Sequence, residues 1–320
     1  MFKDCFKYYK SRNPPPDLDK VFDFSNSEKF SSKIRRINAE NISNSVSNFG
    51  LKPAKTWEIY ELIEHPGLIF IKNPFTSIGQ RYWVVRCLQD YSKRPNKTNL
   101  DDLNLIPEGK EWWDVCQNNN NKILMNKLRW VTLGYHHDWD SKVYTEENKG
   151  EFPKDLADLS RFIAESLNFL HFNAEAAIVN YYHMDSTLSG HTDHSEHNLR
   201  APLISFSFGQ TAIFLLGGKS KEEEPSAMFL RSGDIVIMSE ESRLCYHGVP
   251  KILQMDSRFW NCFEETDFAN DYKNVVNICK EETLWKPFGD YLNNSRININ
   301  VRQVLQRGQK RLCSESDEKT

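Results

Sequence analysis

Residues 180–216 read NYYHMDSTLSGHTDHSEHNLRAPLISFSFGQTAIFLL. The first half is rich in histidine and acidic residues, and the second half holds two apolar, β-prone runs on either side of Gly209 and Gln210. Short apolar runs bounded by turn residues predict buried strands. We interpret this stretch as a chemically active site, and we expect the rest of the chain to enclose that site or to bring a substrate to it.

His191 and Asp193 are two residues apart in this stretch. At the end of an extended strand, residues i and i+2 point to the same side, so both side chains can bind one metal ion. An imidazole and a carboxylate form part of the two-histidine, one-carboxylate triad that leaves open positions on Fe(II). The spacing alone does not decide the matter, because residues 136–138 and 183–185 repeat it.

The composition is that of a folded chain with a full core. The chain has 320 residues, of which 39% are hydrophobic and 12% aromatic. Its net charge of −3 excludes a global polycation that binds nucleic acid nonspecifically. Basic residues are nevertheless in excess over residues 1–56, and residues 296–311 contain no acid. These two segments are either solvated surface or surfaces that face phosphate groups.

The seven cysteines are dispersed and form no C-x-x-C pair, which indicates a reducing compartment and no structural zinc finger. No apolar run reaches transmembrane length, so we expect no membrane contact. The basic N-terminus lacks a secretory apolar core and is either a transit peptide or a basic amphipathic helix. The prolines at 14–16 end this first segment, because proline cannot continue a helix.

Hydrophobic periodicity predicts two helices followed by many short strands. The helices are expected over residues 77–88 and 156–170, and the strands over 68–71, 130–135, 176–182, 203–208, 211–216, 227–230, 234–238 and 296–302. This order favours an α+β protein whose catalytic half is an antiparallel sandwich or jelly roll.

The stretch RININVR at residues 296–302 alternates polar and apolar residues. The period of two sends the apolar residues to one face and Arg296, Asn298, Asn300 and Arg302 to the other. The strand is either an edge strand with a wet polar face or a strand that lines a barrel. In a barrel, Arg296 would bind a carboxylate in bidentate fashion, a contact worth ~1.5–3 kcal/mol.

Three further residues are candidates for the same site. His247, in the stretch RLCYHGVP, follows the strand expected at 234–238 and is either the third metal ligand or a structural histidine. Asn180 and Tyr182 share one face of their strand, where an amide and a phenol can bind a second acid.

Several stretches carry a family resemblance: PGLIFIKNPF, LRWVTLGYH, NYYHMDSTL, HTD, PLISFSFGQTAIFLLGG, SGDIVIMS, SRLCYHGVP and RININVRQVL. Over about residues 49–305 the chain resembles the AlkB family of Fe(II)- and 2-oxoglutarate-dependent dioxygenases, and within it the AlkB homologue 1 subfamily. The family pattern H-x-D…H…R-x-N-x-x-x-R falls on His191, Asp193, His247, Arg296, Asn298 and Arg302.

The resemblance implies a double-stranded β-helix, or jelly roll, with N-terminal helices packed against it. It implies that His191, Asp193 and His247 bind Fe(II), and that Arg296 binds the distal carboxylate of 2-oxoglutarate. The remaining residues implied for the cosubstrate pocket are Asn180, Tyr182, Asn298 and Arg302. Oxygen takes an open metal position, and oxidative decarboxylation supplies the oxidant that hydroxylates a methyl group. An N-methyl base then loses formaldehyde, whereas a carbon-bound methyl group stops at the alcohol or aldehyde.

The substrate implied by the resemblance is a methylated base held out of the stack in an aromatic pocket. The candidates for contacting it are Tyr135, His136, His137 and Trp130, although these residues can equally be core and surface. The subfamily is linked with 1-methyladenine and 5-methylcytosine in tRNA and with N6-methyladenine in DNA, and we favour tRNA over DNA. We expect a monomer in the mitochondrion, the nucleus or both.

The chain divides into four expected regions. They are a basic, polar N-terminal extension (1–56), a substrate-recognition region (57–150), the dioxygenase core (151–306) and a polar tail (307–320).

Three other functions compete with this assignment. A zinc hydrolase would bind its metal through a local set of His191, Asp193, His194 and His197 but would leave the arginines of the last strand unexplained. A non-catalytic jelly-roll module would keep the fold and lose turnover. The same oxidative chemistry on a protein, such as a histone, would need an acidic or apolar groove instead of a basic surface.

Overall fold

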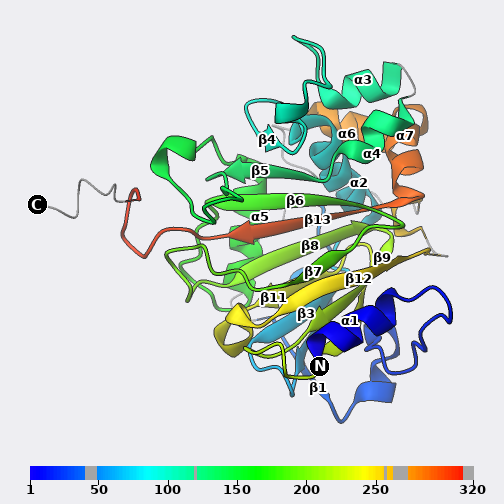
Figure 1. Ribbon diagram of the computed structural model, residues 1–320, viewed down its shortest axis with the longest axis vertical. Helices are drawn as coiled ribbons and strands as arrows, with labels where there is room; N and C mark the ends of the chain where they lie inside the picture. Colours follow the sequence, from blue (N-terminus) through cyan, green and yellow to red (C-terminus); the bar gives the residue numbers. More distant parts are fainter. Residues whose placement is uncertain (40–48, 119–120, 256–257, 262–272, 313–320) are drawn as a thin grey trace, which may run out of the picture.

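The structure is a computed structural model that describes residues 1–39, 49–118, 121–255, 258–261 and 273–312. Two antiparallel sheets form its centre (Figure 1). In spatial order, the larger sheet contains β1 (Ile34–Ile37), β2 (Glu58–Leu62), β3 (Leu68–Lys72), β11 (Ile235–Met238), β8 (Leu203–Gly209), β13 (Ser295–Arg302), β6 (Ala176–His183), β5 (Trp130–Gly134) and β4 (Lys97–Thr98). The smaller sheet contains β10 (Ser226–Leu230), β9 (Thr211–Leu216), β12 (His247–Leu253) and β7 (Leu188–His191).

The eight strands from β6 to β13 divide equally between the two sheets. The larger sheet takes β11, β8, β13 and β6 as consecutive neighbours, and the smaller sheet takes β10, β9, β12 and β7. The chain therefore crosses repeatedly from one sheet to the other, which is consistent with the expected jelly roll. The mixture of helices with antiparallel sheets confirms the α+β class.

Helices cover the outer faces of both sheets. They are α1 (Phe2–Lys10), α2 (Ser77–Val85), α3 (Trp112–Asn118), α4 (Lys122–Lys127), α5 (Lys154–Ser166), α6 (Lys273–Lys280) and α7 (Glu282–Leu292). The basic helix α1 packs on β12 and β7 of the smaller sheet, with Phe2 and Tyr9 buried. No helix in the described part of the chain is both long enough and apolar enough to cross a membrane.

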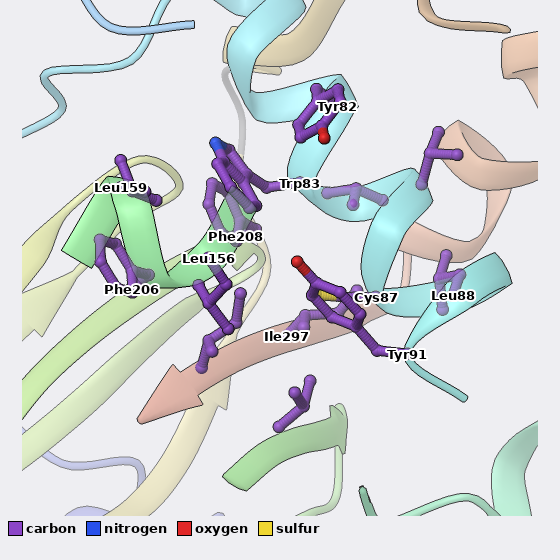
Figure 2. Packing of buried hydrophobic residues seen from close by; sticks show 14 of the residues in the cluster. Tyr82, Trp83, Cys87, Leu88, Tyr91, Leu156, Leu159, Phe206, Phe208 and Ile297 are labelled. Atoms are coloured by element: carbon purple, nitrogen blue, oxygen red, sulfur yellow. The ribbon is translucent and has the colours of Figure 1, made fainter. Parts of the chain in front are cut away.

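The main hydrophobic core lies between the larger sheet and helices α2 and α5. Figure 2 shows Trp83 of α2 and Leu156 of α5 near Phe208 of β8 and Ile297 of β13. Ile299, two residues further along β13, is fully buried in the same cluster. The apolar face of β13 therefore points into this core, as the alternation of RININVR predicts, and the polar face points between the two sheets.

The space between the sheets holds a second apolar cluster. Phe214 and Leu216 of β9 meet Val236 of β11 and Val249 of β12 there. This cluster fills one part of the space between the sheets, and a polar cavity takes up the rest. The sheets are thus held together on one side of the functional site by ordinary apolar packing.

All eight expected strands and both expected helices are present, but sequence patterns missed five strands of the described part of the chain, β1, β2, β4, β7 and β12. β7 has the sequence LSGH, which is short and polar, and β12 begins HGVP, where glycine and proline weaken the strand pattern. α2 begins at Ser77, the first residue of the expected helix. Its N-cap is Thr76, whose hydroxyl accepts a hydrogen bond from the amide of Gly79 at 3.0 Å.

The larger sheet crosses three of the four expected regions. β1 belongs to the N-terminal extension, β2 to β5 belong to the substrate-recognition region, and the central strands belong to the dioxygenase core. These three regions therefore share one sheet. The boundaries between them remain predictions. Residues 313–320 of the expected tail lie outside the described residues.

We predict that Ile299→Ala lowers the free energy of unfolding by about 2–5 kcal/mol, because Ile299 is fully buried beneath the helices. Urea denaturation measures the change. Ile63→Ala is the matched control, since the same side chain is 58% exposed there, and its effect should stay below about 0.5 kcal/mol. Equal effects at the two positions would contradict the packing described here.

Candidate metal and cosubstrate site

A cavity of about 680 Å³ lies between the two sheets. Its lining comes from strands of both sheets and from connecting segments, chiefly residues 137–144 and 192–196. Such a volume is ordinary for a site that binds a small molecule. The polar face of β13 forms one wall, which places Arg296, Asn298, Asn300 and Arg302 in the cavity.

His191, Asp193 and His247 form a compact group of side chains in this cavity that could hold one metal ion. One ligand atom from each residue lies within 4.8 Å of the others. The register explains the approach, because His247 at the start of β12 is the direct partner of His191 on β7. The two imidazole rings are 4.4 Å apart between centroids, and His247 Nε2 lies 3.5 Å from Asp193 Oδ2.

Backbone hydrogen bonds orient both imidazoles. His191 Nδ1 lies 3.0 Å from the carbonyl of Ser189, and His247 Nδ1 lies 3.1 Å from the carbonyl of Cys245. A carbonyl only accepts, so each Nδ1 must carry the proton and donate it. Each Nε2 is left as a lone-pair donor, with burial lowering the pKa of His191. Two such nitrogens and a carboxylate are a donor set that fits Fe(II).

Arg302 keeps Asp193 ionised. Its NH2 group donates to Asp193 Oδ1 at 3.0 Å. Burial by itself raises the pKa of Asp193, but the charge of Arg302 and the two neighbouring imidazoles outweigh it, so the pKa lies well below its usual range. The carboxylate is therefore ready to bind a cation, with one oxygen held by Arg302 and the other near His247.

Arg296 carries a buried charge that lacks an acidic partner among the described residues. Its side chain is 1% exposed, its NH2 group donates to the hydroxyl of Ser207 at 2.8 Å, and its Nε has no hydrogen-bond partner. Burial lowers the pKa of Arg296 to about 10. An unpaired buried charge is costly unless a ligand neutralises it. The group thus fits the carboxylate of 2-oxoglutarate.

The register of β13 with β6 completes this wall. Tyr182 stands opposite Arg296, and Asn180 stands opposite Asn298. Burial raises the pKa of Tyr182 to about 12, so its phenol stays neutral and can donate a hydrogen bond. Asn298 is held by Ser205, whose hydroxyl accepts at 2.8 Å. The structure therefore places all the expected cosubstrate residues on one face.

The four residues expected to contact a substrate lie in different places. His137 lines the cavity, but Tyr135, His136 and Trp130 do not. Tyr135 is buried in a side cluster and donates to Glu146, and His136 is buried beside the hydroxyl of Thr132. The placement of these two residues speaks against direct contact with a molecule in the cavity.

Sequence patterns missed the residues that form a second wall of the cavity, around His137. Trp139, Lys142 and Tyr144 line the cavity beside His137. Trp139 is 46% exposed, and its ring centroid lies 5.2 Å from that of Trp130. These residues sit in a polar loop without periodicity, where only the aromatic character of Trp139 and Tyr144 is a signal.

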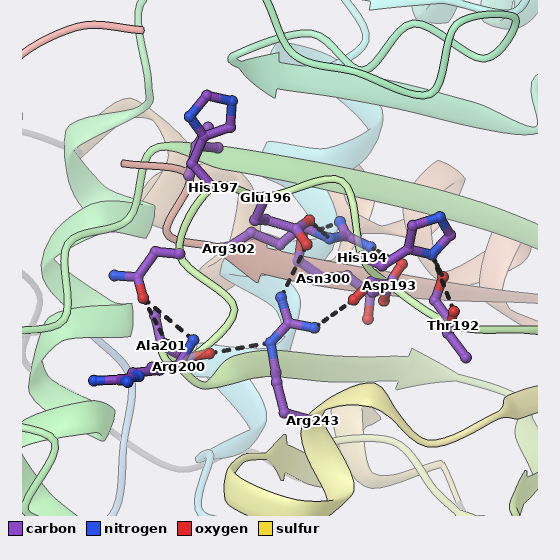
Figure 3. A network of polar contacts seen from close by, with 12 residues as sticks. Thr192, Asp193, His194, Glu196, His197, Arg200, Ala201, Arg243, Asn300 and Arg302 are labelled. Carbon is purple, nitrogen blue, oxygen red and sulfur yellow. Dashed lines mark hydrogen bonds and ion pairs between the residues drawn. The ribbon is translucent and has the colours of Figure 1, made fainter. Parts of the chain in front are cut away.

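The local zinc set suggested by the sequence does not form. His194 is exposed, and its Nδ1 contacts Thr192, while His197 is also exposed (Figure 3). Among the described residues, the metal-binding group takes His247 from a distant strand instead.

Comparison with known proteins agrees with this geometry. The family model described as the 2OG-Fe(II) oxygenase superfamily matches residues 67–302. The chain therefore belongs to the Fe(II)- and 2-oxoglutarate-dependent dioxygenases, enzymes whose cofactor is Fe(II) and whose cosubstrates are 2-oxoglutarate and O₂.

Relatives narrow the family further. Nucleic acid dioxygenase ALKBH1 of Mus musculus is 41% identical, over 96% of this chain and 85% of its own length. The tRNA demethylase abh1 of Schizosaccharomyces pombe is 36% identical over 77% and 82%. The DNA N(6)-methyladenine demethylase ALKBH1A of Arabidopsis thaliana is 30% identical over 94% and 91%. Within the superfamily, the chain is an ALKBH1-type member of the AlkB family.

We predict that Arg296→Ala raises the KM for 2-oxoglutarate by about 10–200-fold, the equivalent of the ~1.5–3 kcal/mol of one charge-assisted contact. Succinate formation at varied 2-oxoglutarate measures the change. Arg161→Ala on the exposed face of α5 is the control and should leave KM unaltered. An unaltered KM in Arg296→Ala would mean that this guanidinium does not hold the cosubstrate.

Proposed function

We propose that the chain oxidises methyl groups on the bases of nucleic acid, and that it does so in the cavity between the sheets of a double-stranded β-helix. The observation that carries the proposal is the pairing of a three-residue metal site with the buried, unpaired guanidinium of Arg296 in one cavity. A metal site alone fits many reactions, whereas a metal site facing a carboxylate-binding arginine fits a dioxygenase that consumes 2-oxoglutarate.

Each side chain has a separate task in this proposal. His191 and His247 bind Fe(II) through Nε2, and Asp193 binds it through a carboxylate oxygen. Arg296 and Tyr182 bind the distal carboxylate of 2-oxoglutarate. When bound, the metal and the cosubstrate together supply the oxidation of a substrate methyl group. The protein contributes a buried cavity, oriented ligands and open metal positions.

Asn180, Asn298 and Arg302 surround the cosubstrate in different ways. Asn180 offers its amide group to the ligand, whereas the amide hydrogens of Asn298 are donated to β8, so Asn298 shapes the wall of the cavity. Arg302 is already engaged with Asp193, so its task is to hold that carboxylate. The two arginines of β13 thus divide binding and orientation between them.

We propose that the base enters along the cavity wall formed by His137, Trp139, Lys142 and Tyr144. Trp139 offers an exposed aromatic face, and His137 stands edge-on to it with ring centroids 4.7 Å apart. Burial lowers the pKa of His137, so its ring stays neutral beside an uncharged base. Aromatic faces stack on any base, which suits a substrate flipped out of its helix.

A nucleic acid fits this cavity better than a protein does. Lys142 and Lys221 are exposed residues of the cavity lining, and a cation at each place favours a phosphate backbone. The relatives' names point to different nucleic acids, and we propose methylated tRNA ahead of DNA. The local excess of basic charge in residues 1–56 suits a phosphate backbone of either kind. Oxidation of a histone side chain is the alternative. The proposal includes a monomer in the mitochondrion or nucleus.

Asp193→Ala should abolish turnover without unfolding the chain, because it removes a metal ligand and leaves the apolar cores intact. Succinate formation is measured with Fe(II), ascorbate, O₂ and four substrates: 1-methyladenine tRNA, 5-methylcytosine tRNA, N6-methyladenine DNA and a histone peptide. Stimulation by one nucleic acid, lost in the variant, is the expected result. Stimulation by the histone peptide alone, or full activity of Asp193→Ala, would contradict the proposal.

Trp139→Ala should raise the KM for the nucleic acid by about 5–150-fold, since stacking one base contributes ~1–3 kcal/mol. The KM for 2-oxoglutarate should not change, because Trp139 is not on the wall of β13. Val143→Ala is the control, as Val143 is an exposed apolar residue of the same loop that does not line the cavity. If Trp139→Ala and Val143→Ala have the same KM for the nucleic acid, the base does not stack on the ring of Trp139.

A further inference from the structure

The metal-binding carboxylate lies outside any strand. β7 ends at His191, and Asp193 belongs to a segment without regular secondary structure. Ladder hydrogen bonds therefore do not fix its position. Two guanidinium groups hold it instead (Figure 3). Arg302 donates to Asp193 Oδ1 at 3.0 Å, and Arg243 NH1 donates to the backbone carbonyl of Asp193 at 2.7 Å.

Glu196 joins these two arginines. Its Oε1 lies 3.0 Å from Arg302 Nε, and its Oε2 accepts from Arg243 NH2 at 2.9 Å. The side chains of Glu196 and Arg243 are only 1% and 2% exposed. The group contains the carboxylates of Asp193 and Glu196 and the guanidinium groups of Arg243 and Arg302, so its charges balance.

Arg243 connects this group to the strand that carries the third metal-binding residue. It lies in a short 3-10 helix, Glu240–Leu244, just before His247 opens β12. Its Nε donates to the carbonyl of Ala201 at 3.0 Å, so this one side chain has three acceptors, two in the segment 192–196 and one at Ala201. The group therefore ties together the ends of β7, β12 and β13, the elements from which the site is built.

Stability alone is a poor reason for such a group. Replacing a buried ion pair with apolar residues of similar volume is often neutral or stabilising. A group of four buried charges around one metal-binding carboxylate is better explained by what it does to that carboxylate. It fixes both the backbone and the side chain of Asp193.

We propose that Glu196 and Arg243 are positioning residues of the metal centre, which fix Asp193 in the orientation that binds the ion. This inference rests on the metal site of the proposed function. Residues that orient a metal ligand typically contribute 10–100-fold to metal affinity or activity. Neither residue belongs to the group that could hold the metal; Arg243 acts through the backbone of Asp193, and Glu196 acts through Arg302 and Arg243.

Co(II) is the probe, because its visible d–d absorption reports both binding and the geometry of its ligands. The variants are Glu196→Gln and Arg243→Met in the full chain. Asp155→Asn is the matched control, since Asp155 is a carboxylate with a 2% exposed side chain that pairs with Arg86 at 2.7 Å, away from the cavity. Thermal denaturation of each metal-free protein measures stability separately.

We expect Glu196→Gln and Arg243→Met to weaken Co(II) binding by about 10–100-fold and to alter the d–d spectrum. The double variant should bind Co(II) with about the affinity of the weaker-binding single variant, because both residues act through one carboxylate. Asp155→Asn should lose thermal stability and keep the wild-type affinity and spectrum. With saturating Fe(II), Glu196→Gln should lower kcat while the KM for 2-oxoglutarate stays constant.

Wild-type Co(II) affinity and spectrum in Glu196→Gln, with a loss of stability like that of Asp155→Asn, would overturn the inference and leave the group a purely structural one. If Glu196→Gln does not fold, Arg243→Lys decides in its place, since it keeps the charge but cannot reach three acceptors. Failure of the underlying metal site looks different: Asp193→Ala would then bind Co(II) as the wild type does.

Discussion

The strand β13 carries two arginines into the interior, and the cost of desolvating these two charges is the constraint on which the rest of the site depends. One face of β13 is apolar and packs under α2 and α5, so the opposite face must point between the sheets. A buried guanidinium without a partner is expensive. The protein resolves the cost for Arg302 and Arg296 in two different ways.

Arg302 is neutralised within the chain. Asp193 and Glu196 both pair with it at 3.0 Å, and the same contacts hold the metal-binding carboxylate in place. Arg296 keeps an unpaired Nε and no acidic partner among the described residues. Its charge is therefore available to an anionic ligand. Arg302 and Arg296 lie six residues apart on β13. Arg302 orients Asp193 at one end of the cavity, and Arg296 can bind an anionic ligand at the other.

Sheet register explains why residues far apart in the sequence meet around these arginines. Pairing of β7 with β12 places His191 beside His247, and pairing of β6 with β13 places Tyr182 beside Arg296. The loop that carries Trp139 closes the remaining side of the cavity. The enzyme class and the fold follow from the strands, while the proposed contact with the base depends on this loop. The loop also meets the metal site, since the phenol of Tyr144 donates to Glu196 Oε1 at 3.4 Å.

The sequence by itself determined the alternation of β13, the pairing of His191 with Asp193 two residues apart, and the strands whose periodicity is strong. These features are local, because the period of a strand is written in consecutive residues. Only the tertiary structure decided that Glu196 and Arg243 meet, that Trp139 reaches the cavity, and that His136 does not. Those outcomes depend on how irregular segments pack against distant strands, and irregular segments carry no period from which a direction can be inferred.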